Sequence, residues 1–387
     1  MLARPIHVGL NAQLLSLEST YRSAGISWYI YHLLQHLPES GDGFRYTAFT
    51  GERRWTPVQG MAAALTRWPT QGPLGRIVWE QLAQPYALAS RRVDLVHSPA
   101  YVLPAAWSGP SVVTILDLSF MLFPERFRPL NRLYLNLFTR LSARRADRVI
   151  AISESTRRDA IRLLGLNADK VQTVYCGVDA FFQPLDRQVI EAYRQRQGLP
   201  DTFILFLGTI EPRKNVEGVI DAYHQLTQQW VASDGTLPNL VIGGARGWYY
   251  EEVYRKVQQL ELDSRVHFVG YVPAEDMALL YNAARAFIYP SFYEGFGLPV
   301  LEAMACGTAI VTSNTSSLPE VIGDAGLKVD PENTEQLGAA LHQLLTDHEM
   351  REKFQAHARQ RAAGFTWNRT AQDTVAVYRQ ALGQEIL

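Results

Sequence analysis

Cysteine, net charge and long apolar runs are all scarce in this chain of 387 residues. Cys176 and Cys306 stand far apart in different segments, and they do not match a disulfide framework, a CxxC redox pair or a zinc site. This cysteine usage is typical of a reducing cytosol. The formal net charge of −1 gives no global attraction to nucleic acid or to membranes.

Long uncharged segments are also missing. The longest, residues 95–116, contains Pro99, Pro104 and Pro110, so we interpret it as two buried strands and a loop rather than a membrane span. The N-terminal sequence MLARPIHVGLN lacks the apolar core of a signal peptide. We therefore expect a soluble, cytoplasmic protein.

Two common motifs are absent as well. No G-x-G-x-x-G follows the first strand of either half, which disfavours a dinucleotide-dependent dehydrogenase. No Asp-x-Asp occurs anywhere in the chain, although clustered carboxylates are the usual ligands of Mg²⁺ and Mn²⁺. We therefore expect no metal site and no resident cofactor.

What the chain does contain is an alternation of short β-rich runs and helical stretches. The strand candidates are near-continuous apolar runs, as expected for strands buried on both faces of a parallel sheet. They are IHVGLN, YTAFTG, DLVHS, SVVTIL, RVIAIS and VQTVYCG in the first half, and FILFLGT, NLVIGG, RVHFVGYV, AFIYPS, AIVTS and GLKVD in the second. The pattern predicts an α/β fold with two Rossmann-like, doubly wound domains. We place them at residues 1–197 and 198–365, with residues 366–387 forming a separate amphipathic helix.

The stretch PSFYEGFGLPVLEAMACG places two glutamates around a glycine-rich turn. Glu294 follows a predicted strand, and Gly295 and Gly297 allow the backbone to pass close to a ligand. Pro299 suits the first turn of a helix, whose free amides form a phosphate site, with Glu302 about one turn further on. Two solvated carboxylates at a helix start are an equally good interpretation of this stretch alone.

Further candidates lie at the carboxyl ends of predicted strands. Arg213 and Lys214 in GTIEPRKN are placed to neutralise a diphosphate, although a surface basic pair has the same pattern. Gly25, before a helix, permits close approach of a phosphate, or is a plain turn. Asp117 and His97 could each hydrogen-bond a sugar, and a structural histidine is the alternative for His97.

Residues 128–148 carry a different signal. An apolar stripe at helical spacing stands beside arginines on another face; the stripe is Leu130, Leu133, Tyr134, Leu137, Phe138 and Leu141, and the arginines are Arg132, Arg140 and Arg144. One interpretation is a basic amphipathic helix in peripheral contact with an anionic membrane. The other is a helix packed on the core with a solvated arginine face.

Taken together, these motifs resemble those of the retaining GT-B glycosyltransferases of family 4, and look most like the bacterial mannosyltransferase branch that builds polysaccharides. The resemblance covers essentially the whole chain and is carried by LGTIEPRKN, VGYVP, PSFYEGFGLPVLEAMACGTAIVTSNTSSLPEVIGDAG and FTWNRTAQDTVAVYR. The spacing of Glu294 and Glu302 is a specific mark of the family. The resemblance implies two domains facing a central cleft, an acceptor site on the first, a donor site on the second, and a last helix that crosses back to the first.

The resemblance also implies roles for individual residues. Arg213 and Lys214 would hold the diphosphate of a nucleotide-sugar donor, Glu294 would face the transferred sugar, and Glu302 would bind the ribose. The donor contacts implied are Gly25, Thr209, Arg213, Lys214, Tyr271, Val272, Glu294, Gly295, Phe296, Gly297, Leu298 and Glu302. The catalytic candidates are Glu294, Arg213, Lys214, Asp117 and His97. The implied reaction is front-face substitution with retention, without metal, from a donor such as GDP-mannose to a glycan or lipid-linked acceptor.

Three positions depart from the family pattern. Leu116 stands before Asp117 where the family often has a histidine, and leucine can neither accept a proton nor hydrogen-bond. Thr209 replaces the usual arginine two residues before Glu-Pro, and Ser27 replaces an arginine common in this branch. Leu116 and Thr209 favour one alternative, a catalytically weakened subunit that binds a nucleotide sugar. A nucleotide-sugar epimerase is the other alternative, and the missing histidine does not favour it.

Overall fold

The structure is a computed structural model of the chain. It describes residues 4–17, 25–66, 68, 70, 72–124, 129–231, 235–247 and 249–384. Among these residues, no helix is both long enough and apolar enough to span a bilayer.

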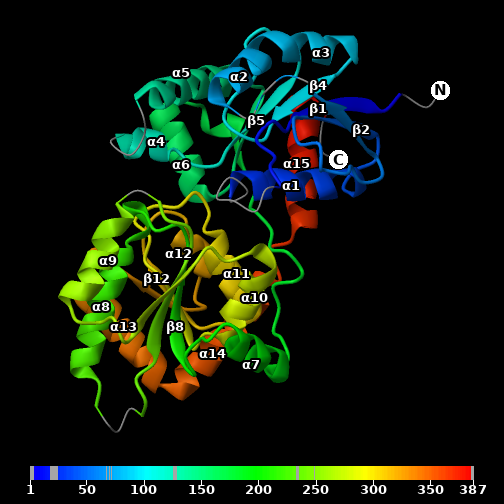
Figure 1. Ribbon diagram of the computed structural model, residues 1–387. Coiled ribbons are helices and arrows are strands. Elements are labelled where there is room, and N and C mark those ends of the chain that lie inside the picture. The colour runs from blue at the N-terminus through cyan, green and yellow to red at the C-terminus, as the bar shows by residue number, and fades with distance from the viewer. Residues whose placement is uncertain are drawn as a thin grey trace. The chain divides into compact units, whose positions relative to one another are not determined.

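The chain forms two compact units (Figure 1). Unit 1 comprises Met1–Gly177 and Thr366–Leu387, and unit 2 comprises Val178–Phe365. The predicted boundary at residues 197 and 198 is therefore wrong by about one helix. Residues 178–197 belong to unit 2, because helix α7 (Arg187–Arg196) packs against α10 (Ala274–Ala283) and Asn282 of α10 accepts a hydrogen bond from the backbone N of Leu185 at 3.0 Å.

Unit 1 contains a seven-stranded parallel sheet in the order β3-β2-β1-β4-β5-β6-β7. Its strands are β1 (Ile6–Asn11), β2 (Phe44–Thr50), β3 (Met61–Leu65), β4 (Leu95–Ser98), β5 (Ser111–Ile115), β6 (Arg148–Ala151) and β7 (Val171–Thr173). Six of them were predicted from their apolar runs. The edge strand β3 was missed because its sequence, MAAAL, has no β-branched residue and three of its five side chains are exposed.

The helices of unit 1 include the last helix of the chain. They are α1 (Ile26–His36), η2 (Leu37–Glu39), α2 (Pro73–Val78), the π-helical η3 (Trp79–Ala83), α3 (Gln84–Ser90), α4 (Ser119–Leu122), α5 (Pro129–Arg145), α6 (Glu154–Leu164), η5 (Ala168–Lys170) and α15 (Trp367–Ala381). Helix α15 packs beside α1, and Thr370 donates a hydrogen bond to the carbonyl oxygen of Tyr175 at 2.7 Å (Figure 1). Residues from the end of the chain thus complete the core of unit 1.

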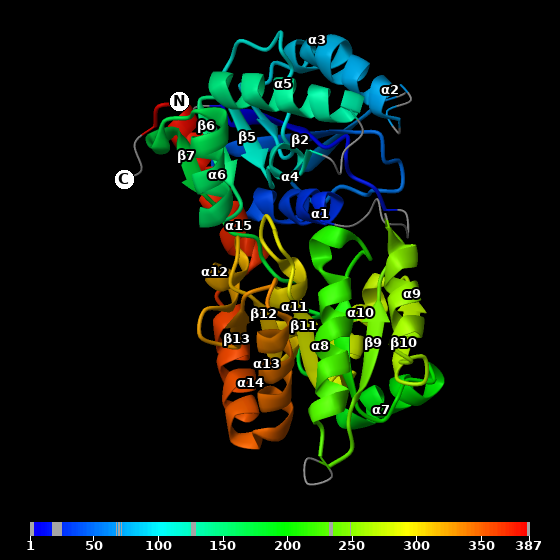
Figure 2. The ribbon, with the colours of Figure 1, turned by 90° about the vertical axis from the view of Figure 1, so that its left-hand side faces the viewer.

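Unit 2 contains a six-stranded parallel sheet in the order β10-β9-β8-β11-β12-β13. Its strands are β8 (Phe203–Leu207), β9 (Asn239–Gly243), β10 (Val266–Gly270), β11 (Ala286–Tyr289), β12 (Ile310–Ser313) and β13 (Leu327–Val329). All six were predicted. Its remaining helices are η6 (Pro212–Lys214), α8 (Val216–Gln229), α9 (Tyr250–Gln259), α11 (Leu298–Cys306), α12 (Leu318–Ile322), α13 (Thr334–Thr346) and α14 (His348–Ala362). Helices α8, α9 and α13 cover one face of the sheet, and α10, α11 and α14 the other (Figures 1 and 2).

The strand orders fix where a ligand site is expected in each unit. In unit 2, β9 and β10 are added on one side of the neighbouring pair β8 and β11, and β12 and β13 are added on the other side. In unit 1 the corresponding neighbouring pair is β1 and β4. Loops that leave two such strands diverge to opposite faces, and the crevice between them is the usual ligand site of an open parallel sheet. The predicted fold class of two doubly wound α/β units is therefore confirmed, and each unit has one such switch point.

Candidate functional site

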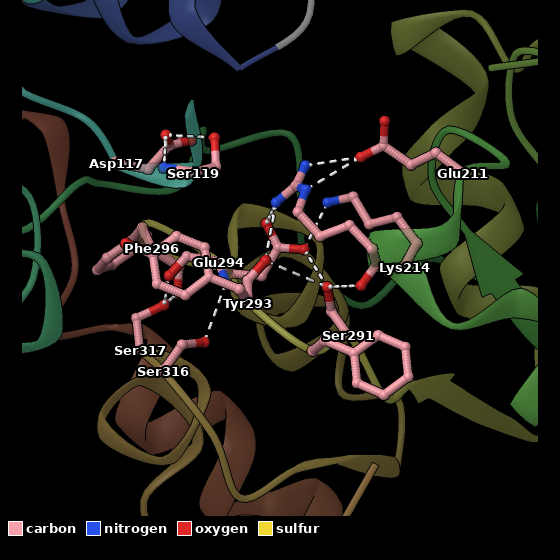
Figure 3. Close-up of polar contacts among 12 residues, drawn as sticks. Asp117, Ser119, Glu211, Lys214, Ser291, Tyr293, Glu294, Phe296, Ser316 and Ser317 are labelled. Atoms are coloured by element: carbon pink, nitrogen blue, oxygen red, sulfur yellow. Dashed lines mark hydrogen bonds and ion pairs between the residues drawn. The ribbon is translucent and has the colours of Figure 1, made fainter. Parts of the chain in front are cut away.

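The strongest cluster of charged groups lies at the switch point of unit 2 (Figure 3). Arg213 and Lys214 lie on the short helix η6, which follows β8. Glu294 lies on the loop between β11 and α11. Because β8 and β11 are parallel neighbours, their carboxyl ends bring these three side chains together. The residues that the sequence singled out from two separate motifs thus form one site.

Glu294 is the centre of this cluster. Its Oε1 accepts hydrogen bonds from Nζ of Lys214 at 2.5 Å, from Oγ of Ser291 at 2.7 Å and from Oη of Tyr289 at 3.1 Å. Its Oε2 accepts a hydrogen bond from Nη1 of Arg213 at 3.1 Å. With an exposed fraction of only 7%, Glu294 is not the solvated carboxylate that the alternative interpretation describes.

Arg213 is held from three sides. Its Nε and Nη2 both donate to Oε1 of Glu211, at 3.1 and 2.9 Å, and its Nη1 also donates to the carbonyl oxygen of Tyr293 at 2.8 Å. The guanidinium therefore ties the loop after β8 to the loop after β11. Lys214 is also buried, with an exposed fraction of 8%. Because Arg213 is fixed by these bonds and Lys214 is buried, the two residues are not a loose basic pair on the surface.

The electrostatics of the cluster favour ionised Glu294. Burial alone would raise its pKa, but Lys214, Arg213 and the hydrogen bonds from Lys214 and Ser291 outweigh burial and bring the pKa to about 2. The pKa of Lys214 is lowered by burial and by the neighbouring charge of Arg213, against the opposing effect of Glu294. The pKa of Tyr289 is raised by burial and by Glu294, so its hydroxyl stays a hydrogen-bond donor.

Three serines, which sequence reasoning did not assign, hold the glutamate loop in place. Ser291 donates towards Glu294 and lies 3.0 Å from the carbonyl oxygen of Arg213. Ser316 Oγ accepts a hydrogen bond from the backbone N of Glu294 at 3.0 Å. Ser317 Oγ lies within hydrogen-bond distance of the carbonyl oxygens of Glu294 and Phe296, at 3.0 and 2.7 Å. Their signal in the sequence is weak, because small hydroxyl residues are common in loops.

Gly297 begins helix α11 in a left-handed conformation, with φ of 107°. A Cβ there would lie 2.6 Å from Cδ2 of Leu318, so both the backbone and the packing require glycine. Pro299 lies in the first turn, as predicted. Gly295, Phe296 and Leu298 lie on the same loop and helix start.

Glu302 lies further along α11 and is 6% exposed. Its Oε2 accepts a hydrogen bond from Oη of Tyr281, on α10, at 3.0 Å. Burial raises the pKa of Glu302 to about 7, with the Tyr281 hydrogen bond acting in the opposite direction. The two glutamates of one motif therefore differ sharply: Glu294 is ionised at neutral pH, whereas Glu302 titrates there.

The remaining donor candidates of unit 2 lie at the same edge of the sheet. Thr209 follows β8, and Tyr271 and Val272 follow β10. The backbone is tightly packed here: a Cβ on Gly244, whose φ is 141°, would lie 1.9 Å from the carbonyl oxygen of Gly208. Tyr271 is 44% exposed, so its ring is accessible.

In unit 1 the prediction for His97 is wrong. His97 lies in β4 with no exposed surface, and its Nδ1 and Nε2 lie 2.7 Å from Oη of Tyr378 and 2.9 Å from Oγ1 of Thr114. Burial lowers its pKa to about 3, so the ring is neutral at physiological pH. His97 therefore connects α15 to the sheet, and we withdraw it as a site residue.

Asp117 remains a candidate. It follows β5, is partly exposed, and its Oδ1 accepts hydrogen bonds from the backbone N and Oγ of Ser119, at 3.0 and 2.8 Å. Leu116 beside it is buried at 6% exposure. Gly25 precedes α1 with φ of 43°, and nothing lies within 4 Å of the position of a Cβ there. Ser27 is buried and bonds both the backbone N and the carbonyl oxygen of Ser16, at 2.9 Å each.

A polar cluster at the switch point of unit 1 was missed. Nδ2 of Asn11, the last residue of β1, lies 3.1 Å from Oε1 of Glu80 and 3.4 Å from Oγ of Ser98, the last residue of β4. Tyr134 Oη donates to Oε2 of Glu80 at 3.3 Å. Burial raises the pKa of Glu80. The signal that could have found this cluster is the position of Asn11 and Ser98 at the ends of neighbouring strands.

Comparison with known proteins matches both units to glycosyltransferase families. Residues 23–180 match the family described as Glycosyltransferase Family 4, and residues 189–361 match the family described as Glycosyl transferases group 1. The O-antigen chain mannosyltransferase B of Escherichia coli is 35% identical over 298 residues, which cover 76% of this chain and 77% of the relative.

Two further similarities differ in what they cover. The serotype-specific mannosyltransferase WbdA of Escherichia coli is 32% identical over 316 residues, which cover 77% of this chain but only 38% of that longer protein. Among solved structures, the sucrose-phosphate synthase of Thermosynechococcus elongatus matches with a TM-score of 0.78 at 22% identity, over 98% of this chain and 100% of that one.

Proposed function

Because this chain belongs to glycosyltransferase family 4 and has GT-B architecture, we propose that it is a retaining mannosyltransferase that uses GDP-mannose. The acceptor in this proposal is a hydroxyl of a glycan or a lipid-linked glycan, in polysaccharide or glycoconjugate biosynthesis. The observation that carries it is the junction of Arg213 and Lys214 with Glu294 at the switch point of unit 2. The mannosyl group and the acceptor class are supported by the named mannosyltransferase relatives.

The geometry of unit 2 suits a donor that carries negative charge in its middle. Two cations and two carboxylates form a chain of ion pairs: Glu211 with Arg213, Arg213 with Glu294, and Glu294 with Lys214. A diphosphate brings further negative charge, which Arg213 and Lys214 would offset together with the backbone amides at the start of α11. We assign Glu294 to the transferred sugar, Glu302 to the ribose, and Tyr271 and Val272 to the base.

The proposed reaction needs no strong protein base. The acceptor oxygen forms a bond to the anomeric carbon on the face from which the diphosphate leaves. The bond from that carbon to the phosphate oxygen breaks, and a diphosphate oxygen takes the acceptor proton. Arg213 and Lys214 stabilise the developing charge of the leaving group, and the fixed loops position the reactants. We assign no metal to this reaction, and Asp117 of unit 1 orients the acceptor.

One alternative has an observation in its favour. Leu116 is buried where the family often has a histidine, and Thr209 stands where an arginine is usual. The first change removes a side chain that could hydrogen-bond and the second removes a positive charge, as in a subunit that binds a nucleotide sugar without transferring it efficiently.

A thermal-shift screen of nucleotide sugars tests the proposal. A ligand at 100 times its Kd adds roughly 2.7 kcal/mol to the free energy of unfolding. We expect GDP-mannose to stabilise the chain more than UDP-glucose or ADP-glucose. Release of GDP in the presence of acceptor then separates a transferase from a binding subunit. Stabilisation by another nucleotide sugar alone would overturn the donor assignment.

A further inference from the structure

Helix α5 of unit 1 exposes most of its leucines. Four of the five face solvent: Leu130, Leu133, Leu137 and Leu141 have exposed fractions of 82%, 65%, 59% and 40%. The buried residues of α5 are small or polar, namely Thr139, Ser142 and Ala143, whereas Tyr134, Leu135 and Phe138 are half-buried. Core packing therefore does not account for these four leucines, because a helix packed for stability alone buries its leucines. Arg128 of the predicted segment 128–148 lies outside the described residues, and α5 ends at Arg145.

A second apolar row lies on the helical segment formed by α2, η3 and α3. Leu74, Val78, Leu82 and Tyr86 follow one another at intervals of four residues, and their exposed fractions are 79%, 39%, 73% and 79%. The same segment buries Glu80 and Gln84. This row was not part of the sequence prediction. It shows that the exposure of large apolar side chains is not confined to α5.

The two rows belong to neighbouring elements. Tyr134 of α5 donates a hydrogen bond to Glu80 of η3, and α5 lies beside α2 and α3 in both ribbon views (Figures 1 and 2). Both elements also bind the loop between β4 and β5. Gln81 Oε1 accepts a hydrogen bond from the backbone N of Ala105 at 2.8 Å, and Ser142 Oγ accepts one from the backbone N of Leu103 at 2.8 Å. The eight side chains therefore lie on neighbouring elements of unit 1, and we call them together the apolar face.

The charge around the apolar face is positive. Residues 73–92 and 129–145 contain seven arginines, and Glu80, which is buried, is their single acidic residue; the arginines are Arg76, Arg91, Arg92, Arg132, Arg140, Arg144 and Arg145. The whole chain, in contrast, has 37 basic and 38 acidic residues. Positive charge is therefore concentrated on the same elements that expose large apolar side chains.

We propose that the apolar face docks on the surface of an anionic phospholipid bilayer, with α5 and the α2–α3 segment lying in the interface. Leucine side chains enter the acyl boundary, and arginine side chains reach the lipid phosphates while their stems stay in apolar contact. Charge complementarity selects this occupant over a second copy of the chain, because two copies would bring fourteen arginines together. Membrane docking is independent of the donor and of the transfer reaction.

Vesicle flotation tests the proposal with the full chain. We expect it to float with vesicles of phosphatidylcholine and phosphatidylglycerol, and to float far less with phosphatidylcholine alone. Leu133→Ser combined with Leu137→Ser should lower the partition coefficient by about tenfold or more, since both leucines lose apolar contact with lipid. Arg132→Gln combined with Arg140→Gln should weaken binding and make it less sensitive to salt.

The matched control is Val189→Ser combined with Val231→Ser, which changes two exposed apolar residues of unit 2. It should bind vesicles like the wild-type chain. Circular dichroism of the leucine variant should show an unchanged fold, because both side chains are exposed. Failure of the wild-type chain to bind anionic vesicles would overturn the proposal. So would a wild-type dimer in ultracentrifugation that the leucine substitutions dissociate while vesicle binding persists.

Discussion

Lys214 and Glu294 bind each other: Nζ lies 2.5 Å from Oε1, and both residues are buried. The sequence assigned them to different parts of a donor, the diphosphate and the sugar. Their direct contact shows that the cations of this site are charge-balanced by Glu294 and Glu211. In the proposed donor site, a diphosphate bound by Lys214 would therefore also change the surroundings of Glu294, which we assign to the sugar.

Glu294→Gln removes the charge that balances Lys214. Breaking a buried pair leaves an uncompensated charge, so we expect the free energy of unfolding to fall by about 3 kcal/mol at neutral pH, measured by urea denaturation. Because the pKa of about 2 in the folded state lies below the ordinary value of 4.5, the stabilisation is present above pH 4.5 and is lost as the pH falls towards 2. The difference between wild type and variant should shrink over that range.

Glu211→Gln is the matched control for that variant. Glu211 also pairs with Arg213, but its side chain is more exposed than that of Glu294, at 16% against 9%. We expect a smaller loss of stability and a smaller loss of turnover. Equal effects of the two substitutions on turnover would contradict the special position of Glu294.

Glu302→Gln should separate stability from donor binding. The pKa of about 7 in the folded state lies above the ordinary value of 4.5, so stability falls as the pH rises from 4.5 through 7 and Glu302 ionises. Glutamine carries no charge and still accepts from Tyr281, so the variant should be more stable than wild type at pH 8, by on the order of 2 kcal/mol. Its Kd for the donor, measured by titration calorimetry, should nevertheless rise by about tenfold through loss of the ribose contact. An unchanged Kd would contradict the ribose assignment.

Asp117 and Leu116 test the acceptor side. Asp117→Ala should lower turnover by about a hundredfold, because the acceptor loses its orienting group. Asp117→Asn keeps an oxygen for Ser119, so it controls for loss of the local turn and should retain the loop conformation. Leu116→His should leave turnover unchanged, since Leu116 is buried. Full activity of both Asp117→Ala and Leu116→His would contradict the role of Asp117.

Gly297→Ala probes the start of helix α11. The left-handed φ and the clash with Leu318 together should lower the free energy of unfolding by roughly 1–3 kcal/mol. Gly270→Ala is the control, because Gly270 also has a positive φ, of 72°, but nothing lies within 4 Å of its Cβ position. Thermal unfolding should therefore show a larger loss for Gly297→Ala, and equal losses would mean that Leu318 yields without cost.

The sequence predicted the strands well and the environments of side chains less well. Buried parallel strands such as FILFL are recognised by a continuous run of large apolar residues. The exposed edge strand MAAAL consists mainly of alanine and lacks that signal. His97 and Arg213 illustrate the second limit. His97 lies within β4 and Arg213 follows β8. Burial and partners from residues more than 75 positions away decide that His97 is structural and that Arg213 belongs to the site.

The apolar stripe of α5 shows a third limit. Helical spacing identified Leu133 and Leu137 as one face, but periodicity alone cannot tell whether that face meets the core or the solvent. In α5 the buried positions are taken by small residues such as Ala143, so most of the leucines face solvent. Which face of the helix is buried depends on the packing of the whole unit.

The anomeric configuration of the product tests the central claim most directly. The chain would be incubated with GDP-mannose and mannose-terminated, lipid-linked acceptors, and the new glycosidic bond would be assigned by NMR. The account predicts a mannosyl product with the same anomeric configuration as the donor. A product of inverted configuration would contradict it, because front-face attack beside a diphosphate held by Arg213 and Lys214 cannot invert the anomeric carbon.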